Sequence, residues 1–168
     1  LFLQVTGRRP DGYHEIYSLM CPVGLYDSIE PTFEGDGMVV NCDHPDVPED
    51  ETNLVCRAAK LFYENLGMDP PGIRFRIDKN IPVAAGLGGG SSNAASVLKW
   101  LNSLLKKPFS NEHLKEIGLG LGADVPFFIP CKPAIATGIG EKLLLYSGLP
   151  KYKVVLIYPG IRISTALV

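Results

Sequence analysis

The feature that most constrains this chain is a glycine-rich segment between a predicted strand and a predicted helix. Residues 81–93 read I-P-V-A-A-G-L-G-G-G-S-S-N, with four glycines in five positions. Because these glycines lack Cβ atoms, an anion can approach the backbone amides closely. The first amides of the following helix have no acceptors within it and lie at the positive end of its dipole. The segment therefore predicts a phosphate site, with the Ser91 and Ser92 hydroxyls available to a phosphate oxygen or to Mg²⁺.

Two common phosphate-binding motifs fit this segment poorly. A Walker loop carries a lysine directly after its last glycine, whereas the first lysine here is Lys99, deep in the predicted helix. A dinucleotide fingerprint needs a third glycine where Ser91 stands, and an acidic residue about twenty positions later. The remaining alternative is a packing turn without a ligand. We favour a phosphate site because glycines and serines are dense here and precede a strong helix.

The apolar periodicity around the segment predicts an α+β domain. Strands and helices do not alternate strictly, which argues against a doubly wound sheet. Strands are predicted at Leu1–Thr6, Ile16–Pro22, Ser28–Phe33, Met38–Asn41, Ile73–Ile77, Ala134–Gly138 and Lys153–Tyr158. Helices are predicted from Leu54 to Leu66, capped by Asn53 and stopped by Gly67, from Ser92 to Leu105, and from a Ser110 cap to Gly120 or Gly122.

Composition and charge argue against several classes of protein. The net charge of −2 over 168 residues provides no broad basic field, so nucleic acid is not expected as a partner. No apolar run has the length of a membrane span, so no membrane partner is expected. The four cysteines form no C-x-x-C pair. Free thiols in a reducing compartment, the cytoplasm or a plastid stroma, are therefore predicted.

Two further clusters contain residues suited to chemistry. Asp124 lies in L-G-L-G-A-D-V-P-F-F, residues 119–128. A carboxylate among apolar residues is expected either to have a hydrogen-bonding or charged partner or to serve a function. From these residues alone, Asp124 could equally cap a short helix with Pro126 in its first turn. The second cluster, D-G-Y-H, places Tyr13 and His14 after a turn. By itself it indicates only a structured hairpin with an incidental histidine.

Together these clusters resemble the GHMP kinase superfamily, which includes galactokinase, homoserine kinase and mevalonate kinase. The matching sequence segments are G-R-R-P-D-G-Y-H at 7–14, the run from Pro82 to Ala95, L-G-A-D-V-P-F at 121–127 and T-G-I-G-E at 137–141. The resemblance implies the GHMP N-terminal domain, similar to the second domain of ribosomal protein S5. That fold is a mixed β-sheet with helices on one side and a left-handed βαβ crossover, a handedness against the usual rule.

The resemblance also implies roles for particular residues. Asn53 and Lys79 would lie near an adenine, Tyr13 and His14 would recognise a cytosine, and Asp124 would be the catalytic carboxylate. The ATP phosphates would be wrapped by the glycine-rich segment, consisting of Pro82, Val83, Ala84, Ala85, Gly86, Leu87, Gly88, Gly89, Gly90, Ser91 and Ser92. The implied cofactors are ATP and Mg²⁺.

The D-G-Y-H and G-A-D-V-P elements point to one branch of the superfamily. Its members phosphorylate the 2-hydroxyl group of a cytidyl-diphosphate methylerythritol in the non-mevalonate isoprenoid pathway. The alternatives are another GHMP small-molecule kinase of the homoserine or mevalonate type, a non-catalytic S5-like nucleotide- or RNA-binding module, and, least favoured, a dinucleotide oxidoreductase. A monomer or weak homodimer is expected.

The resemblance also predicts how the chain divides. Residues 1–158 would be the ATP-binding domain, and residues 159–168 would start the connection to a C-terminal domain. In the family, a catalytic lysine, and an asparagine two places after it, precede the L-F-L run that opens this sequence at Leu1. We therefore expect the fragment as given not to turn over.

Overall fold

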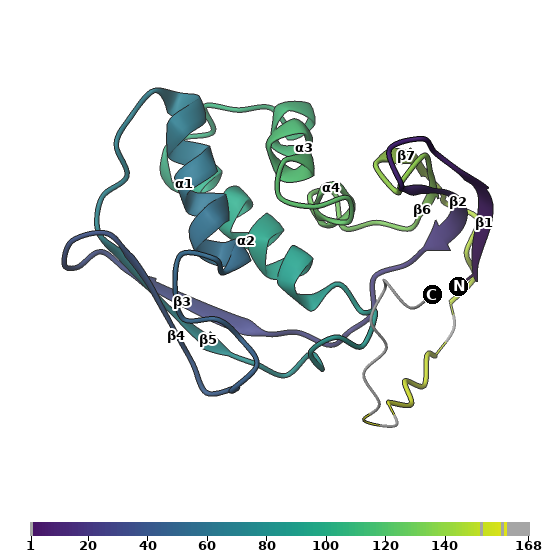
Figure 1. Cartoon of the computed structure of the whole chain (residues 1–168), viewed down its shortest axis with the longest axis horizontal. Helices are drawn as coiled ribbons and strands as arrows, with labels where there is room; N and C mark the ends of the chain where they lie inside the picture. Colours follow the sequence, from purple (N-terminus) through teal and green to yellow (C-terminus); the bar gives the residue numbers. More distant parts are fainter. Residues whose placement is uncertain (1, 152, 159, 161–168) are drawn as a thin grey trace.

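The computed structural model describes residues 2–151, 153–158 and 160. Within them, two β-sheets flank a group of helices (Figure 1). The strands are β1 (Phe2–Arg8), β2 (His14–Met20), β3 (Ser28–Thr32), β4 (Met38–Cys42), β5 (Ile73–Asp78), β6 (Ala134–Thr137) and β7 (Lys142–Leu145). The helices are α1 (Leu54–Leu66), α2 (Gly89–Leu104), α3 (Asn111–Leu119) and α4 (Val125–Phe128).

The three-stranded sheet has the order β3-β5-β4, with β5 antiparallel to β3 and parallel to β4. Alternate residues of β5 are buried, namely Ile73, Phe75 and Ile77, while the arginines between them are exposed. This period of two turns one face toward α1 and α2, which lie over the sheet in Figure 1. β4, α1 and β5 form a β-α-β unit whose left-handed crossover stays a prediction.

The core lies between this sheet and the helices. Helices α1 and α2 pack together, and the largest buried side chains include Phe62 on α1, Phe75 on β5 and Leu98 on α2. Burying side chains of this size stabilises a fold by about 1.5–3 kcal/mol each. The core therefore fixes both the strand and the helix between which the glycine-rich segment runs.

The four-stranded sheet is antiparallel throughout and has the order β1-β2-β6-β7. β7 was not predicted from the sequence, because its K-L-L-L run lacks apolar–polar alternation and remains largely exposed. Helices α3 and α4 both contact α2. α4 ends at Phe128, and β6 begins at Ala134. This order brings the segment before α4 between the two sheets.

Most predicted elements are present, but two predictions differ from the structure and a third lies largely outside its described residues. α2 begins at Gly89, three residues before the predicted Ser92, so its first turn includes glycines of the loop. The predicted strand Lys153–Tyr158 is wrong as far as its residues are described, since 153–158 adopt no regular structure and Val155 and Ile157 remain over 80% exposed. The predicted connection at 159–168 lies, apart from Gly160, outside the described residues.

Candidate functional site

The glycine-rich segment forms a loop that ends in the first turn of α2. Gly86 and Gly88 have positive φ angles of 70° and 66°, a backbone region that favours glycine. The Ser92 N–H donates to the Gly88 carbonyl at 2.8 Å, the first hydrogen bond within the helix. The amides of Gly89, Gly90 and Ser91 precede it, which is the arrangement that binds anions at helix N-termini.

Close packing explains why side chains are excluded from this turn. A Cβ on Gly89 would lie 3.0 Å from Ile81 Cγ2 and 3.2 Å from Lys79 Nζ. One on Gly90 would lie 3.3 Å from a methyl group of Leu54. This turn is thus closely packed against Ile81, Lys79 and Leu54, and the last two also line the neighbouring cavity.

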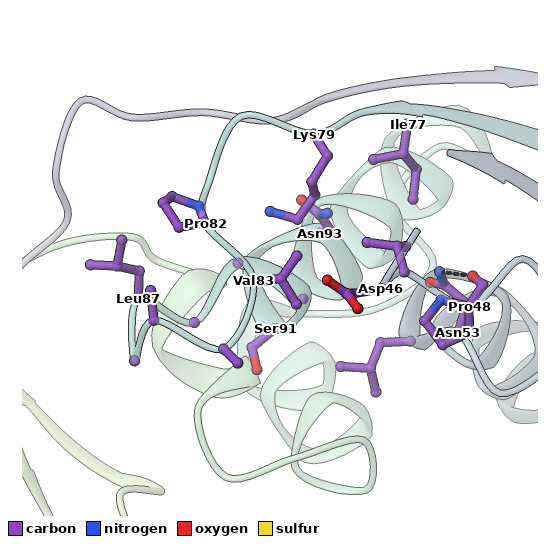
Figure 2. Close-up of a pocket in the computed structure, with 18 of the residues that line it drawn as sticks. Asp46, Pro48, Asn53, Ile77, Lys79, Pro82, Val83, Leu87, Ser91 and Asn93 are labelled. Atoms are coloured by element: carbon purple, nitrogen blue, oxygen red, sulfur yellow. Dashed lines mark hydrogen bonds between the residues drawn. The ribbon is translucent and has the colours of Figure 1, made fainter. Parts of the chain in front are cut away.

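A cavity of about 380 Å³ lies along the open side of the loop. Its lining includes every predicted nucleotide-binding residue from Pro82 to Ser91, together with Asn53 and Lys79. Ser92 is the exception, because it faces other cavities. Figure 2 shows Lys79 and Asn93 beside the loop, with Asn53 and Pro48 across the cavity. The volume falls in the range of small-molecule sites.

Asn53 and Lys79 are both held in place by the protein. The Asn53 Oδ1 atom accepts from the Val55 N–H at 2.9 Å, which confirms it as the cap of α1, and its Nδ2 donates to the Pro48 carbonyl at 2.6 Å. The Lys79 ammonium, whose side chain is 5% exposed, pairs with Asp27 at 3.1 Å and also donates to the Ile81 carbonyl. The predicted adenine contacts of both residues stay predictions.

A second cavity, of about 720 Å³, lies on the opposite side of the loop. Gly86, Leu87 and Gly88 line both cavities, so this part of the loop forms a shared wall. Ser92 and Asp124 line the second cavity together with residues from β2 and the segment after it. A phosphoryl group held at the loop would therefore face a carboxylate from the neighbouring cavity.

Asp124 is the only charged residue lining this second cavity within the described part of the chain. It occupies the N-cap position of α4 with Pro126 in the first turn, yet its side chain makes no capping hydrogen bond. The carboxylate is exposed to the cavity, and the protein around it desolvates it enough to raise its pKa above the ordinary 3.8. A carboxylate left uncapped with a raised pKa suits general-base chemistry.

Tyr13 and His14 lie at the turn between β1 and β2, and both are exposed. The turn is ordered by an ion pair between Arg9 and Asp11 at 2.8 Å and by the Tyr13 N–H, which donates to Asp11. Neither residue lines the two cavities, although Ile16, two positions after His14, lines the second. The structure thus places the predicted nucleotide residues around one loop, whereas the predicted cytosine residues lie at the start of β2, outside both cavities.

One buried residue at the site was not predicted from the sequence. Asp27, with a fully buried side chain, contacts Lys79, Asn80, Ile81 and Asn93. These partners are more than fifty positions away along the chain. No local pattern in L-Y-D-S signals such contacts.

The described part of the chain contains no group of three or more His, Cys, Asp or Glu side chains placed to hold a metal ion. None of its helices combines the length and the apolar character needed to cross a bilayer.

Known proteins resemble this chain both in the region that contains the loop and over nearly its whole length. The family model for the GHMP kinases N terminal domain matches residues 53–131, which run from the cap of α1 to just beyond α4. A 4-diphosphocytidyl-2-C-methyl-D-erythritol kinase of Syntrophotalea carbinolica is 50% identical over 167 residues, covering 99% of this chain and 59% of that protein. A kinase of the same name from Clostridium botulinum is 45% identical over 165 residues, covering 98% of this chain and 59% of that protein. The chain thus spans 59% of the length of these curated relatives.

Solved structures agree with the fold. A crystal structure of 4-(cytidine 5'-diphospho)-2C-methyl-D-erythritol kinase superposes with a TM-score of 0.76 and 37% identity, covering 98% of this chain and 58% of that chain. The Methanococcus jannaschii mevalonate kinase superposes with a TM-score of 0.57 at 16% identity, covering 82% and 50%, and shares the fold alone. The α+β fold predicted from the sequence resemblance is confirmed.

Proposed function

We propose that this chain, whose residues 53–131 match the model of the GHMP kinases N terminal domain, supplies the ATP site and catalytic carboxylate of a 4-diphosphocytidyl-2-C-methyl-D-erythritol kinase. The reaction would transfer the γ-phosphoryl group of ATP to the 2-hydroxyl of the cytidyl substrate. One observation carries the proposal: the glycine-rich loop separates a nucleotide-sized cavity from a second cavity that contains Asp124. Donor and acceptor could therefore approach the same loop from opposite sides.

The loop amides would bind and orient the phosphates, since the first turn of α2 offers N–H groups and a positive dipole end. Asp124 would accept the proton of the attacking hydroxyl as the oxygen–phosphorus bond forms and the bond to ADP breaks. Its raised pKa makes it a stronger base than an ordinary aspartate. Positioning and charge neutralisation supply most of the rate enhancement in such transfers.

Mg²⁺ is part of this proposal, and the residues present are compatible with it. Protein-bound Mg²⁺ with a nucleotide commonly has one or two carboxylates and several phosphate and water oxygens as ligands. The Ser91 and Ser92 hydroxyls and the Asp124 carboxylate are among the protein oxygens that line the cavities beside the loop. When bound, the ion would neutralise charge that develops on the phosphates.

The second substrate would be recognised at the start of β2. We propose that Tyr13 stacks on the cytosine and that His14 forms hydrogen bonds with it, as the relatives' names and the D-G-Y-H element suggest. The exposed position of both side chains leaves them accessible to a ligand. Homoserine- and mevalonate-type kinases remain alternatives that share the fold at 16–17% identity.

We further propose a protein of the cytoplasm or plastid stroma, monomeric or weakly dimeric, that does not bind nucleic acid. All four cysteines are free, as in proteins of reducing compartments. The net charge of −2 gives no electrostatic attraction for nucleic acid.

A coupled assay of ADP release from the full-length protein tests the reaction. Saturable turnover is expected with the cytidyl methylerythritol substrate, and not with mevalonate or homoserine at matched concentrations. Turnover with either of the latter two substrates alone would assign the protein to another GHMP kinase. ATP binding without turnover on any of the three would favour a non-catalytic module.

A further inference from the structure

We propose that Asp27 is a positioning residue that clamps both ends of the phosphate loop with the two oxygens of one carboxylate. The inference rests on the proposed role of this loop in ATP binding. Asp27 lies just before β3 and contributes nothing to the lining of the nucleotide cavity itself. Its contacts nevertheless converge on the residues that enter and leave the loop.

The entry end of the loop is held by Oδ1. This atom accepts hydrogen bonds from the Asn80 N–H at 2.8 Å and from the Ile81 N–H at 2.7 Å. Both amides belong to the residues that directly precede Pro82. Two short bonds from consecutive amides to one carboxylate oxygen fix the direction in which the chain leaves β5.

The exit end is held by Oδ2, which accepts from Asn93 Nδ2 at 2.9 Å. Asn93 is 6% exposed and lies in the first turns of α2, directly after Ser92. The eleven residues from Pro82 to Ser92 thus run between two anchors on the same side chain. A loop with fixed ends has fewer conformations to lose when it binds a ligand.

Lys79 balances the charge of this clamp. Its Nζ lies 3.1 Å from Oδ2 and 3.2 Å from Oδ1 of Asp27, and both side chains are almost completely buried. Without this ammonium group, a buried carboxylate beside the loop would repel the phosphates. Removing either partner alone would leave an unpaired buried charge, which is strongly unfavourable.

The clamp also positions the residues on which the first turn of α2 packs, namely Lys79 and Ile81. Lys79 Nζ is 3.2 Å and Ile81 Cγ2 3.0 Å from the place where a Gly89 side chain would begin. The start of α2 therefore rests on the two residues that Asp27 orients. A shift of the Asp27 carboxylate would move Lys79, Ile81 and Asn93 together. The amides of Gly89 to Ser91 would move with them.

Two variants of the full-length protein test the inference. Asp27→Asn keeps an oxygen for the entry amides but turns an NH₂ group toward Asn93 and Lys79. Asn93→Ala leaves the ion pair intact and removes the exit anchor together with a side chain that lines the nucleotide cavity. We expect the ATP dissociation constant to rise at least tenfold in Asp27→Asn and several-fold in Asn93→Ala, with the KM for the second substrate unchanged. Amide hydrogen exchange in residues 83–91 should accelerate in both nucleotide-free variants.

Asn102→Ala is the matched control, because Asn102 is an equally buried asparagine on α2 with two 3.0 Å hydrogen bonds to Phe109, away from the loop. It should lower stability without changing ATP affinity or loop exchange. If Asp27→Asn does not fold, loop exchange in nucleotide-free Asn93→Ala decides the question, because Asn93 also lines the nucleotide cavity and its ATP affinity alone would not. Wild-type affinity and wild-type loop exchange in the folded variants would overturn the clamp. Failure of the wild-type protein to bind ATP would instead overturn the proposed function. Amide hydrogen exchange in the nucleotide-free variants would still test the clamp in that case.

Discussion

The ring of Phe128 occupies the space into which a side chain on Gly88 would project. A Cβ at Gly88 would lie 2.9 Å from both Cε2 and Cζ of that ring. Phe128 is the last residue of α4, and Asp124 is the cap of the same short helix. One helix therefore carries the carboxylate at its start and abuts the phosphate loop at its end, which fixes the two parts of the candidate site relative to each other.

Replacing Gly88 with alanine should damage both stability and nucleotide binding. The left-handed backbone of Gly88 costs a residue with a Cβ about 1–2 kcal/mol, and overpacking against Phe128 adds about 1–3 kcal/mol. We expect urea denaturation to show this loss and ATP titration to show weaker binding. Gly7→Ala is the control, since a Cβ there would meet only Glu15 Cβ at 4.0 Å. Unchanged ATP affinity in Gly88→Ala would show that the turn does not contact the phosphates.

Asp124→Asn should abolish phosphoryl transfer and preserve ATP binding. The amide cannot accept the substrate proton, whereas the loop amides that bind phosphate remain in place. Loss of a general base lowers kcat by about 10²–10⁴-fold. Single-turnover kinetics and ATP calorimetry on the same preparation measure the two effects. Loss of nucleotide binding together with a lower melting temperature would assign Asp124 a structural role.

The same carboxylate gives a pH prediction with a definite sign. Desolvation raises the pKa of Asp124 above 3.8 in the folded protein, so the unfolded chain releases this proton at lower pH. As pH rises through that window, the unfolded state binds fewer protons and this group lowers the free energy of unfolding. We expect Asp124→Asn to be at least as stable as wild type at pH 7, with the difference vanishing below pH 3.8. Urea titrations across pH test this, and a larger advantage in acid would contradict it.

Two variants of Asn53 separate its two hydrogen bonds. Asn53→Asp keeps the cap on the Val55 N–H but loses the donor to the Pro48 carbonyl, whereas Asn53→Ala loses both. Removing the cap costs about 0.5–2 kcal/mol. We expect the alanine variant to be the less stable one and both variants to bind ATP more weakly, because the Pro48 bond fixes one wall of the cavity. Equal stability of the two variants would show that the cap contributes little.

The parts of the fold that the sequence predicted are those with local physical causes. The span of α1 follows from Asn53 as cap and Gly67 as stop, and the structure has both, with Gly67 at a φ of 67°. β5 follows from strict alternation, and its burial pattern alternates in the same way. The phosphate loop was predictable because its glycines adjoin a strong helix pattern.

The parts that the sequence did not predict depend on contacts between distant segments. Asp27 reaches Asn93 across 66 positions, and no periodicity links an aspartate before one strand to an asparagine in a later helix. Lys153–Tyr158 has the composition of a strand, yet it pairs with no described strand, so its composition alone could not decide its structure. The short strand β7 forms because β6 offers a partner, and its own sequence does not require it.

The cysteines give a prediction that tests the core independently of function. Cys56 on α1 is 3% exposed, and burial, with smaller effects from Glu51 and Asp50, raises the pKa of its thiol to about 11. Because only the thiolate is alkylated, a two-unit shift from 9.0 lowers the reactive fraction at pH 8 about 100-fold. Iodoacetamide should therefore label the exposed Cys131 readily and spare Cys56 until urea unfolds the protein, as peptide mass mapping can show. Rapid labelling of both residues in the native protein would mean that α1 opens far more readily than its packing against α2 implies.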